Sequence, residues 1–144
     1  MVPLRLVHPA AVVPRRARLS DAGLDLVAGE ELKLDPGGGR GLVRTGLELA
    51  LPAGLAALVV PRSGLALHHG VTCLNGPGLI DPGYRGEIGV VLVNTDPGES
   101  FVVRPGDRVA QLLFLAHTPV QLVVQEGPFA ATDRGAHGFG HTGR

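Results

Sequence analysis

The chain has 144 residues, enough for one domain with its own core, and its 13 basic and 13 acidic residues give a formal net charge of zero. A neutral chain has no overall field that would hold nucleic acid or an anionic membrane, so we expect stable binding to neither. No apolar run approaches the ~18 residues of a membrane span, and the N-terminus lacks the apolar core of a secretory signal. The lone Cys73 allows no intrachain disulfide, which suits a reducing compartment, and we expect a cytoplasmic protein.

Strand-like patterns dominate the chain in order. In the run 42–51, strict alternation places five residues on one face, which is typical of a half-buried strand. These residues are Val43, Thr45, Leu47, Leu49 and Leu51. The other strand-like runs are 3–8, 24–28, 31–34, 55–60, 87–95, 100–104, 108–117 and 120–124.

Glycine and proline, 22 and 12 residues respectively, divide these runs into short pieces. Many short strands separated by such turns indicate an all-β sandwich or barrel. The one helical candidate is "SGLALHHG", directly after Pro61, and "DPGGGR" (35–40) predicts a hairpin turn. The glycine-rich stretch 126–144 shows no alternation, so we predict a β domain over 1–125 followed by a flexible arm.

Two familiar kinds of site are not expected. The turn 35–40 lacks the Gly-Lys-Ser/Thr ending of a phosphate loop. The adjacent His68 and His69 would lie on opposite sides of an extended chain, and no HExxH or Cys/His cluster accompanies them. A zinc site held by protein side chains is therefore not expected.

Three polar segments leave alternatives open. "PRSGLA" (61–66) could present Arg62, a hydroxyl and free amides to an anion at the start of a helix, or its serine could only cap that helix. "SDAGLDL" (20–26) could be a turn before a strand or could supply a ligand. Gln111, in "RPGDRVAQ", lies inside an apolar strand, where an unpaired amide would be costly, so we expect it to have a partner.

The stretch "NGPGLIDPGYRGEI" (75–88) combines several groups that a nucleoside needs. Asp81, in a Pro-Gly turn, can stand free of the strand ladder, and Tyr84, the one tyrosine of the chain, offers a flat face with a polar tip. Asn75 can donate and accept hydrogen bonds at once, as the edge of a base requires. Together these residues indicate a nucleoside pocket beside a general base.

Five segments resemble, in order and spacing, the five motifs of the trimeric dUTPases, and the resemblance runs from about residue 3 to residue 143. They are "SDAGLDL", "PRSGLA", "NGPGLIDPGYRGEI", "RPGDRVAQLLF" and "RGAHGFGHTG". The resemblance implies hydrolysis of dUTP to dUMP and pyrophosphate by a jelly-roll-like β-sandwich. It also implies a homotrimer with shared active sites, in which each arm is donated to a neighbour.

The resemblance implies a role for each motif residue. Asp81 would be the general base that activates water for attack on the α-phosphorus, and Tyr84 would pack under the deoxyribose and exclude a 2′-hydroxyl. Phe139 would stack on the uracil, and Asp25 would orient the water shell of a Mg²⁺ bound through the triphosphate. The residues expected to contact the uracil edge are Asn75, Gly78 and Ile80. Those expected to contact the phosphates are Arg62, Ser63, Gly64, Gln111, Arg134, Gly140, His141 and Thr142.

Two other interpretations of the same residues remain. The related dCTP deaminases are a poorer match, because Tyr84 and the arm with Phe139 are features of the uracil hydrolases. A non-catalytic dUTPase-like protein that binds nucleotide or a partner would not need Asp81, although a second, regulatory role stays open. His141 replaces the Ser or Thr that is frequent in the family, which preserves amide contacts but removes a hydroxyl.

Overall fold

The computed structural model describes residues 1–137, which form ten strands and one short helix. The first five strands precede the helix. The elements are β1 (Leu4–Leu6), β2 (Leu24–Val27), β3 (Leu32–Leu34), β4 (Arg40–Leu49), β5 (Leu55–Val60), α1 (Ser63–His69), β6 (Val71–Cys73), β7 (Gly78–Ile80), β8 (Glu87–Asn94), β9 (Phe101–Val103) and β10 (Arg108–Ala116).

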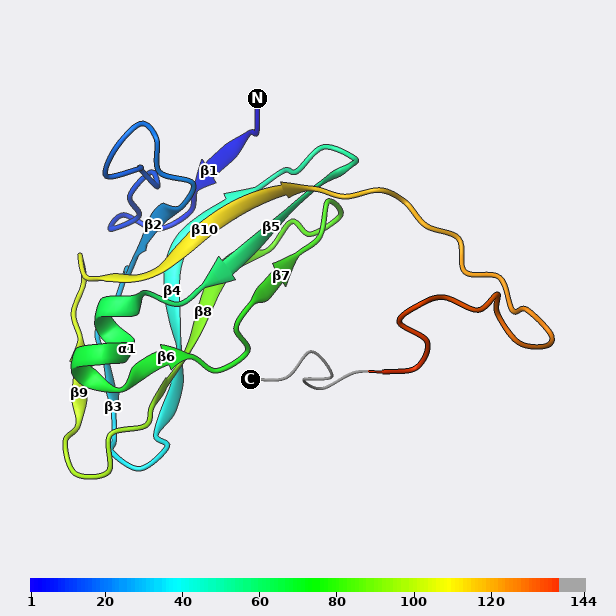
Figure 1. Ribbon diagram of the computed structural model, residues 1–144. Coiled ribbons are helices and arrows are strands. Elements are labelled where there is room, and N and C mark those ends of the chain that lie inside the picture. Colours follow the sequence, from blue (N-terminus) through cyan, green and yellow to red (C-terminus); the bar gives the residue numbers. More distant parts are fainter. Residues whose placement is uncertain (138–144) are drawn as a thin grey trace.

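The strands build two four-stranded sheets, in the orders β1-β4-β8-β6 and β2-β10-β5-β7, and a two-stranded sheet, β3-β9. Neighbouring strands are antiparallel throughout, and the two larger sheets pack face to face (Figure 1). The predicted class, an all-β jelly-roll-like sandwich with one short helix, is confirmed. None of the helices described within 1–137 is long and apolar enough to cross a membrane.

The core lies between the two sheets and follows the alternation of the sequence. The predicted inward residues of β4 are buried, and so are Ile88, Val90 and Leu92 of β8. Thr45, the polar member of the β4 row, is buried and donates a 2.6 Å hydrogen bond to the carbonyl oxygen of Ile88. Burial of a hydroxyl is tolerated here because it has a partner.

The strand predicted at 120–124 is wrong. Residues 117–137 form no helix or strand, and they lead away from the sandwich (Figure 1). In this run Val120, Leu122 and Val124 are 83%, 94% and 94% exposed. A segment with high strand propensity forms a strand only where it can pair with the edge of a β-sheet. Within residues 1–137 of one copy of the chain, no sheet edge pairs with this segment.

Two turns are connections between sheets. The predicted hairpin turn 35–40 joins β3 to β4, but β3 pairs with β9. Residues 74–77 join β6, which pairs with β8, to β7, which pairs with β5. The sequence did not predict β6 and β7 as strands, because three residues are too few for alternation to show.

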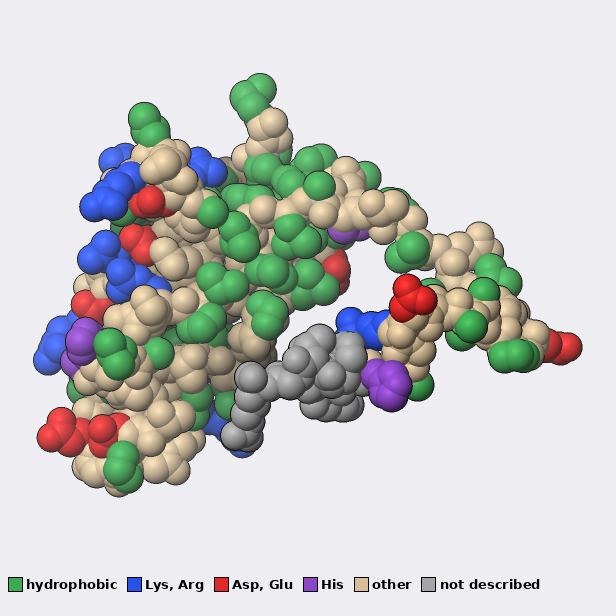
Figure 2. Space-filling model, viewed as in Figure 1, with side chains coloured by type: hydrophobic (Ala, Val, Ile, Leu, Met, Phe, Trp, Pro, Cys, Tyr) green, Lys and Arg blue, Asp and Glu red, His purple; other side chains and the backbone are tan. Residues whose placement is uncertain are grey.

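The outer face of the sheet β2-β10-β5-β7 is apolar at its centre. Leu113, Leu58 and Leu79 lie side by side across β10, β5 and β7, and Leu79 is 62% exposed. Figure 2 shows hydrophobic side chains gathered over these strands. Leu58 and Leu113 are half-buried, and a partly exposed apolar row of this kind is typical of a surface that meets another protein chain.

Candidate functional site

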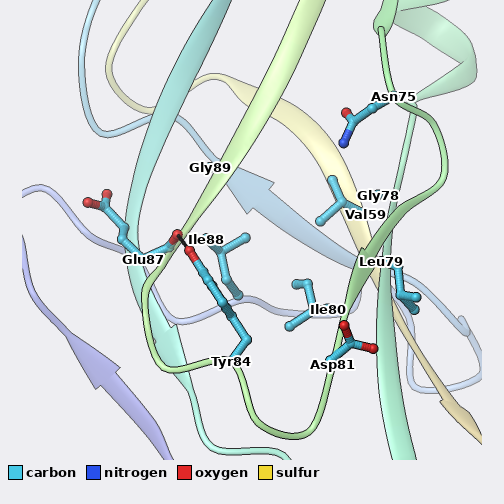
Figure 3. Close-up of a pocket in the computed structure, with 10 residues that line it drawn as sticks. All are labelled: Val59, Asn75, Gly78, Leu79, Ile80, Asp81, Tyr84, Glu87, Ile88 and Gly89. Carbon is cyan, nitrogen blue, oxygen red and sulfur yellow. Dashed lines mark hydrogen bonds between the residues drawn. The ribbon is translucent and has the colours of Figure 1, made fainter.

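A pocket of about 180 Å³ opens between β5, β7 and the start of β8 (Figure 3). A cavity of about 150 Å³ can hold one benzene ring, so this pocket has room for one six-membered ring rather than for a whole nucleotide. Its walls come from the segments that the sequence singled out. The lining residues are Val59, Asn75, Gly78, Leu79, Ile80, Asp81, Tyr84, Glu87, Ile88 and Gly89.

Asp81 stands at the edge of this pocket, directly after β7. The amide of Tyr84 donates a 3.1 Å hydrogen bond to the Asp81 carbonyl oxygen, so residues 81–84 form the tight turn that the sequence predicts. The Asp81 side chain is exposed and makes no hydrogen bond or ion pair with any residue of the described chain. Water can therefore reach both carboxylate oxygens, and either can accept a proton.

Tyr84 forms another wall of the pocket, and its ring is held at the hydroxyl end. Its hydroxyl donates a 2.9 Å hydrogen bond to the carbonyl oxygen of Glu87. Gly86 makes room for this contact, because a Cβ there would lie 2.5 Å from the tyrosine oxygen. The ring is 46% exposed, so one face remains open to a ligand. A flat, partly exposed face is suited to packing against a sugar.

The side of the pocket away from Tyr84 is formed by the connection between β6 and β7. In Figure 3 Asn75 lies at the far end from Tyr84, and Ile80 lies between them. Ile80 is buried, whereas the Asn75 amide is exposed and makes no hydrogen bond within residues 1–137. Gly78 allows this amide to approach, since a Cβ at Gly78 would lie 3.3 Å from its nitrogen. An apolar floor with one amide at its end suits the edge of a base.

A cluster of charged residues, Asp25, Arg62 and Arg108, lies where β2, β5 and β10 end. Asp25 Oδ1 is 3.3 Å from Arg62 Nε, and Asp25 Oδ2 is 3.3 Å from Arg108 Nη1. Arg62 Nη1 also donates a 3.1 Å hydrogen bond to the Arg108 carbonyl oxygen. The cluster therefore carries two guanidinium groups and one carboxylate, which leaves a net positive charge. No role for Arg108 was predicted from the sequence, because its contact with Asp25 depends on the pairing of β10 with β2.

Gln111 and the start of α1 lie next to this cluster. Gln111 is opposite Asp25 on β2 and Val60 on β5, and its side chain makes no hydrogen bond within the described residues. The expected partner of Gln111 is thus not a side chain or backbone group of the described residues; the side chain is half-buried, so water can satisfy it. The serine-cap alternative is also wrong, because Arg62 is the N-cap residue and Ser63 is the first residue of the helix. Ser63 and Gly64 are exposed.

One carboxylate oxygen of the cluster accepts no hydrogen bond within the described residues. Asp25 Oδ1 is buried and makes no hydrogen bond, since its 3.3 Å contact with Arg62 is an ion pair without hydrogen-bond geometry. No group of three or more His, Cys, Asp or Glu side chains in residues 1–137 could hold a metal ion by itself. This donor set fits Mg²⁺ in the mode in which substrate phosphates and water supply most of the ligands and the protein supplies one carboxylate.

The predicted site residues thus fall into separate groups within one chain. Asp25, Arg62 and Gln111 do not line the pocket that contains Asp81 and Tyr84. Arg134 lies in the exposed segment 117–137, where its Nε donates a 3.2 Å hydrogen bond to the His137 carbonyl oxygen. The remaining predicted contacts are outside the described residues. They are Phe139, Gly140, His141 and Thr142.

A charged pair beside the pocket, Arg44 and Glu87, was not predicted from the sequence. Glu87 accepts hydrogen bonds from Arg44 and from the amide of Gly46, and the guanidinium of Arg44 holds the pKa of Glu87 below its usual value. The same contact raises the pKa of Arg44. The alternation of 42–51 predicted only that Arg44 faces outward. The pair depends on an irregularity in the pairing of β4 with β8, which no local pattern reveals.

A ring-sized pocket beside an accessible carboxylate, with guanidinium groups on the same small β-sandwich, is suited to hydrolysis of a nucleotide. The comparisons with known proteins agree. The family model described as dUTPase matches residues 10–143, and the chain belongs to the dUTPase family. The prediction of a family of nucleotide hydrolases is therefore confirmed.

Relatives and solved structures cover almost the whole chain. The deoxyuridine 5′-triphosphate nucleotidohydrolase of Mycobacterium leprae is 49% identical over 141 residues, which are 95% of this chain and 91% of that protein. The corresponding protein of Thermobifida fusca is 47% identical over 142 residues, covering 99% of this chain and 78% of that one. The structure of the Staphylococcus bacteriophage 80alpha dUTPase with dUpNHpp matches with a TM-score of 0.89 at 24% identity, covering 100% and 99% of the two chains, which shows the shared fold.

Proposed function

We propose that this chain hydrolyses dUTP to dUMP and pyrophosphate. The proposal is carried by the position of the open Asp81 carboxylate at the edge of a pocket that fits one ring. It is supported by 49% identity to a deoxyuridine 5′-triphosphate nucleotidohydrolase. Such an activity limits the incorporation of uracil into DNA and supplies dUMP for thymidylate synthesis. The cytoplasmic location stays a prediction.

In the proposed reaction, Asp81 accepts a proton from a water molecule. The water oxygen forms a bond with the α-phosphorus in line with the leaving group, and the bond from that phosphorus to the α–β bridging oxygen breaks. The electron pair of that bond leaves with pyrophosphate, and the proton taken by Asp81 returns to solvent. A positioned carboxylate base contributes about 10²–10⁴-fold to the rate.

Uracil and the deoxyribose would be recognised in the pocket. Asn75, together with backbone groups around Gly78 and Ile80, would read the edge of the base. The open face of Tyr84 would pack under the sugar and leave no space for a 2′-hydroxyl. The hydroxyl of Tyr84 is already bonded to Glu87, so the ring meets the ligand with its apolar face.

The phosphates would be bound by arginine side chains and backbone amides. A triphosphate carries about four negative charges, and groups aimed at the charge that develops in the transition state usually give the largest acceleration. Arg62, Ser63 and Gly64 would bind the α- and β-phosphates, and Gln111 would bind phosphate or its waters. In the last motif, Arg134 would bind the γ-phosphate, Phe139 would stack on the uracil, and the amides of Gly140, His141 and Thr142 would complete the phosphate site.

Asp25 would orient the water shell of a Mg²⁺ held mainly by the triphosphate, which fits its single buried oxygen without a hydrogen bond. The ion would neutralise phosphate charge. Asp25 itself keeps Arg62 and Arg108 in place, which fixes the guanidinium groups before the substrate arrives.

A homotrimer with shared active sites would bring the separate groups together. Within one chain, none of the residues that line the pocket of Asp81 belongs to the cluster of Asp25, Arg62 and Arg108. The partly exposed row Leu58, Leu79 and Leu113 and the exposed apolar segment 120–124 would both be covered by a neighbouring copy. We propose that the β domain ends near residue 125 and that the arm 126–144 closes a site on a neighbouring subunit.

The test is pyrophosphate release in the presence of magnesium, measured in parallel on dUTP, UTP, dTTP and dCTP. We expect rapid release from dUTP and far less from the other three. Equal rates on dUTP and UTP would contradict the role of Tyr84, and no release from dUTP would contradict the proposed function itself.

A further inference from the structure

The Arg44–Glu87 pair adjoins the pocket but has no place in the proposed reaction. We propose that this pair positions the Tyr84 ring and so helps to set the preference for 2′-deoxynucleotides over ribonucleotides. The inference rests on the proposed function and assigns two positioning residues to it. Neither residue needs to touch the substrate.

Strand β4 is irregular where it faces the start of β8. The pairing of β4 with β8 changes register between Arg44 and Glu48, and Gly46 there has a φ of 70°. That left-handed conformation favours glycine. A Cβ on Gly46 would also lie 2.7 Å from the Cβ atoms of His8 and Ala11. The bulge therefore turns the amide of Gly46 out of the regular ladder, so that it needs another acceptor.

Glu87 supplies that acceptor at the first residue of β8. Its Oε1 accepts a 2.8 Å hydrogen bond from the Gly46 amide. Its Oε2 accepts a 2.9 Å bond from Arg44 Nε and a second, shorter contact from Arg44 Nη2. The Glu87 side chain is 18% exposed, so both oxygens are held in a largely buried position. Charge-assisted bonds of this kind are about twice as strong as neutral ones, and together they fix the start of β8 on β4.

The same residue holds Tyr84 through its backbone. The Tyr84 hydroxyl donates to the Glu87 carbonyl oxygen at 2.9 Å, and Gly86 leaves the space for this bond. Any movement of Glu87 relative to β4 therefore moves the acceptor that sets the tilt of the ring. In Figure 3 the Glu87 side chain points away from the pocket while the Tyr84 ring extends into it. The carboxylate thus acts on the pocket only through the backbone and the ring.

The experiment uses Tyr84 as its own reporter, because the chain has one tyrosine and no tryptophan. Fluorescence anisotropy and near-ultraviolet circular dichroism of the ligand-free protein would be measured for Glu87→Gln, Arg44→Met and Arg44→Lys. Glu48→Gln is the matched control: Glu48 lies opposite Glu87 across β4 and β8 and pairs with Arg5, but it has no link to Tyr84. We expect a more mobile ring in Glu87→Gln and Arg44→Met, a partial effect in Arg44→Lys, and no change in Glu48→Gln.

The second measurement is the ratio of kcat/KM for dUTP to that for UTP. If the pocket rejects one added hydroxyl by packing alone, this ratio is on the order of 100 in the wild type. We expect Glu87→Gln and Arg44→Met to lower it about tenfold, largely by better use of UTP. Glu87→Gln combined with Tyr84→Phe should lower it no further than Tyr84→Phe does, because both changes act on the same ring.

The outcomes separate the two proposals. A wild type that cleaves neither nucleotide would contradict the proposed function, while the tyrosine signal would still show whether the pair holds the ring. A selective wild type whose variants keep both the tyrosine signal and the ratio would overturn the inference. An altered tyrosine signal with an unchanged ratio would also overturn it. If Glu87→Gln fails to fold, the same two measurements on Arg44→Lys decide the question. Lysine retains the positive charge and loses only the bidentate geometry of the guanidinium group.

Discussion

Two aspartates that lie on or next to the sheet β2-β10-β5-β7 have opposite environments. Asp81, after β7, is exposed and has no side-chain partner in the described chain, whereas Asp25, on β2, is 15% exposed and lies against two guanidinium groups. A proton acceptor needs the first environment, because water must reach it. A group that holds arginines for a polyphosphate needs the second. The comparison shows that burial and partners, rather than residue type, separate the proposed base from the proposed phosphate site.

The largest effect is expected at Asp81. Asp81→Asn keeps the shape of the side chain and removes its ability to accept a proton, so turnover of dUTP should fall by about 10²–10⁴-fold. Binding of a non-hydrolysable analogue and the melting temperature should stay close to those of the wild type, because the Asp81 side chain makes no hydrogen bond or ion pair within residues 1–137. Steady-state kinetics and calorimetry would measure both. Turnover at the wild-type rate would remove Asp81 as the base.

The next largest effect is expected from removing the arm. A chain that ends at residue 133 loses Arg134 and Phe139 but keeps every strand of the sandwich. Activity should fall about 100-fold if these residues stabilise the transition state, while the mass measured by light scattering should remain that of a trimer. A truncated protein that falls apart into single chains would show that the arm serves assembly rather than the site.

A smaller effect on rate, and a larger one on stability, is expected at Asp25. Asp25→Ala leaves Arg62 and Arg108 close together without their shared carboxylate, which should cost about 1–3 kcal/mol in the free energy of unfolding. Activity should also fall, with a rise in the magnesium concentration needed for half-maximal rate. Denaturant unfolding and a magnesium titration would separate the two effects. Asp21→Ala, at an aspartate of the same motif that accepts a bond only from the Arg18 amide, is the matched control.

The smallest effect is expected on the free energy of unfolding at acid pH, when Glu87 is replaced. Arg44 lowers the pKa of Glu87 in the folded chain, so the stabilisation is complete above the ordinary pKa of a glutamate, about 4.3, and is lost as pH falls through the lowered value. Glu87→Gln should therefore flatten the dependence of the free energy of unfolding on pH below that point. Asp96→Asn is the comparison variant: backbone amides of Glu99 and Gly98 lower the pKa of Asp96, so this change should also flatten the curve, without involving Arg44. A Glu87→Gln curve parallel to that of the wild type would contradict this account.

The sequence predicted most of the fold, but not the pairing between distant segments. Alternation identified the buried faces of β4 and β8 because it is a local property of the chain. The Asp81 turn was predictable for the same reason. The Arg44–Glu87 pair and the contact of Asp25 with Arg108 were not, since each depends on which strands are neighbours and on a bulge or register shift between them. The run 120–124 was misassigned because a strand needs an edge, and the sequence does not say which chain provides it.

The central claim is that Asp81 and the arm act in one site although they come from different copies of the chain. Asp81→Asn protein and protein truncated after residue 133 would be unfolded together, refolded in equal amounts and assayed for pyrophosphate release from dUTP. If each site takes its base from one chain and its arm from another, about half of the sites have an intact Asp81 and about half have an intact arm. Random trimers should therefore recover activity in about a quarter of their sites. Mixed trimers that recover no activity above that of the two parent variants would contradict the claim.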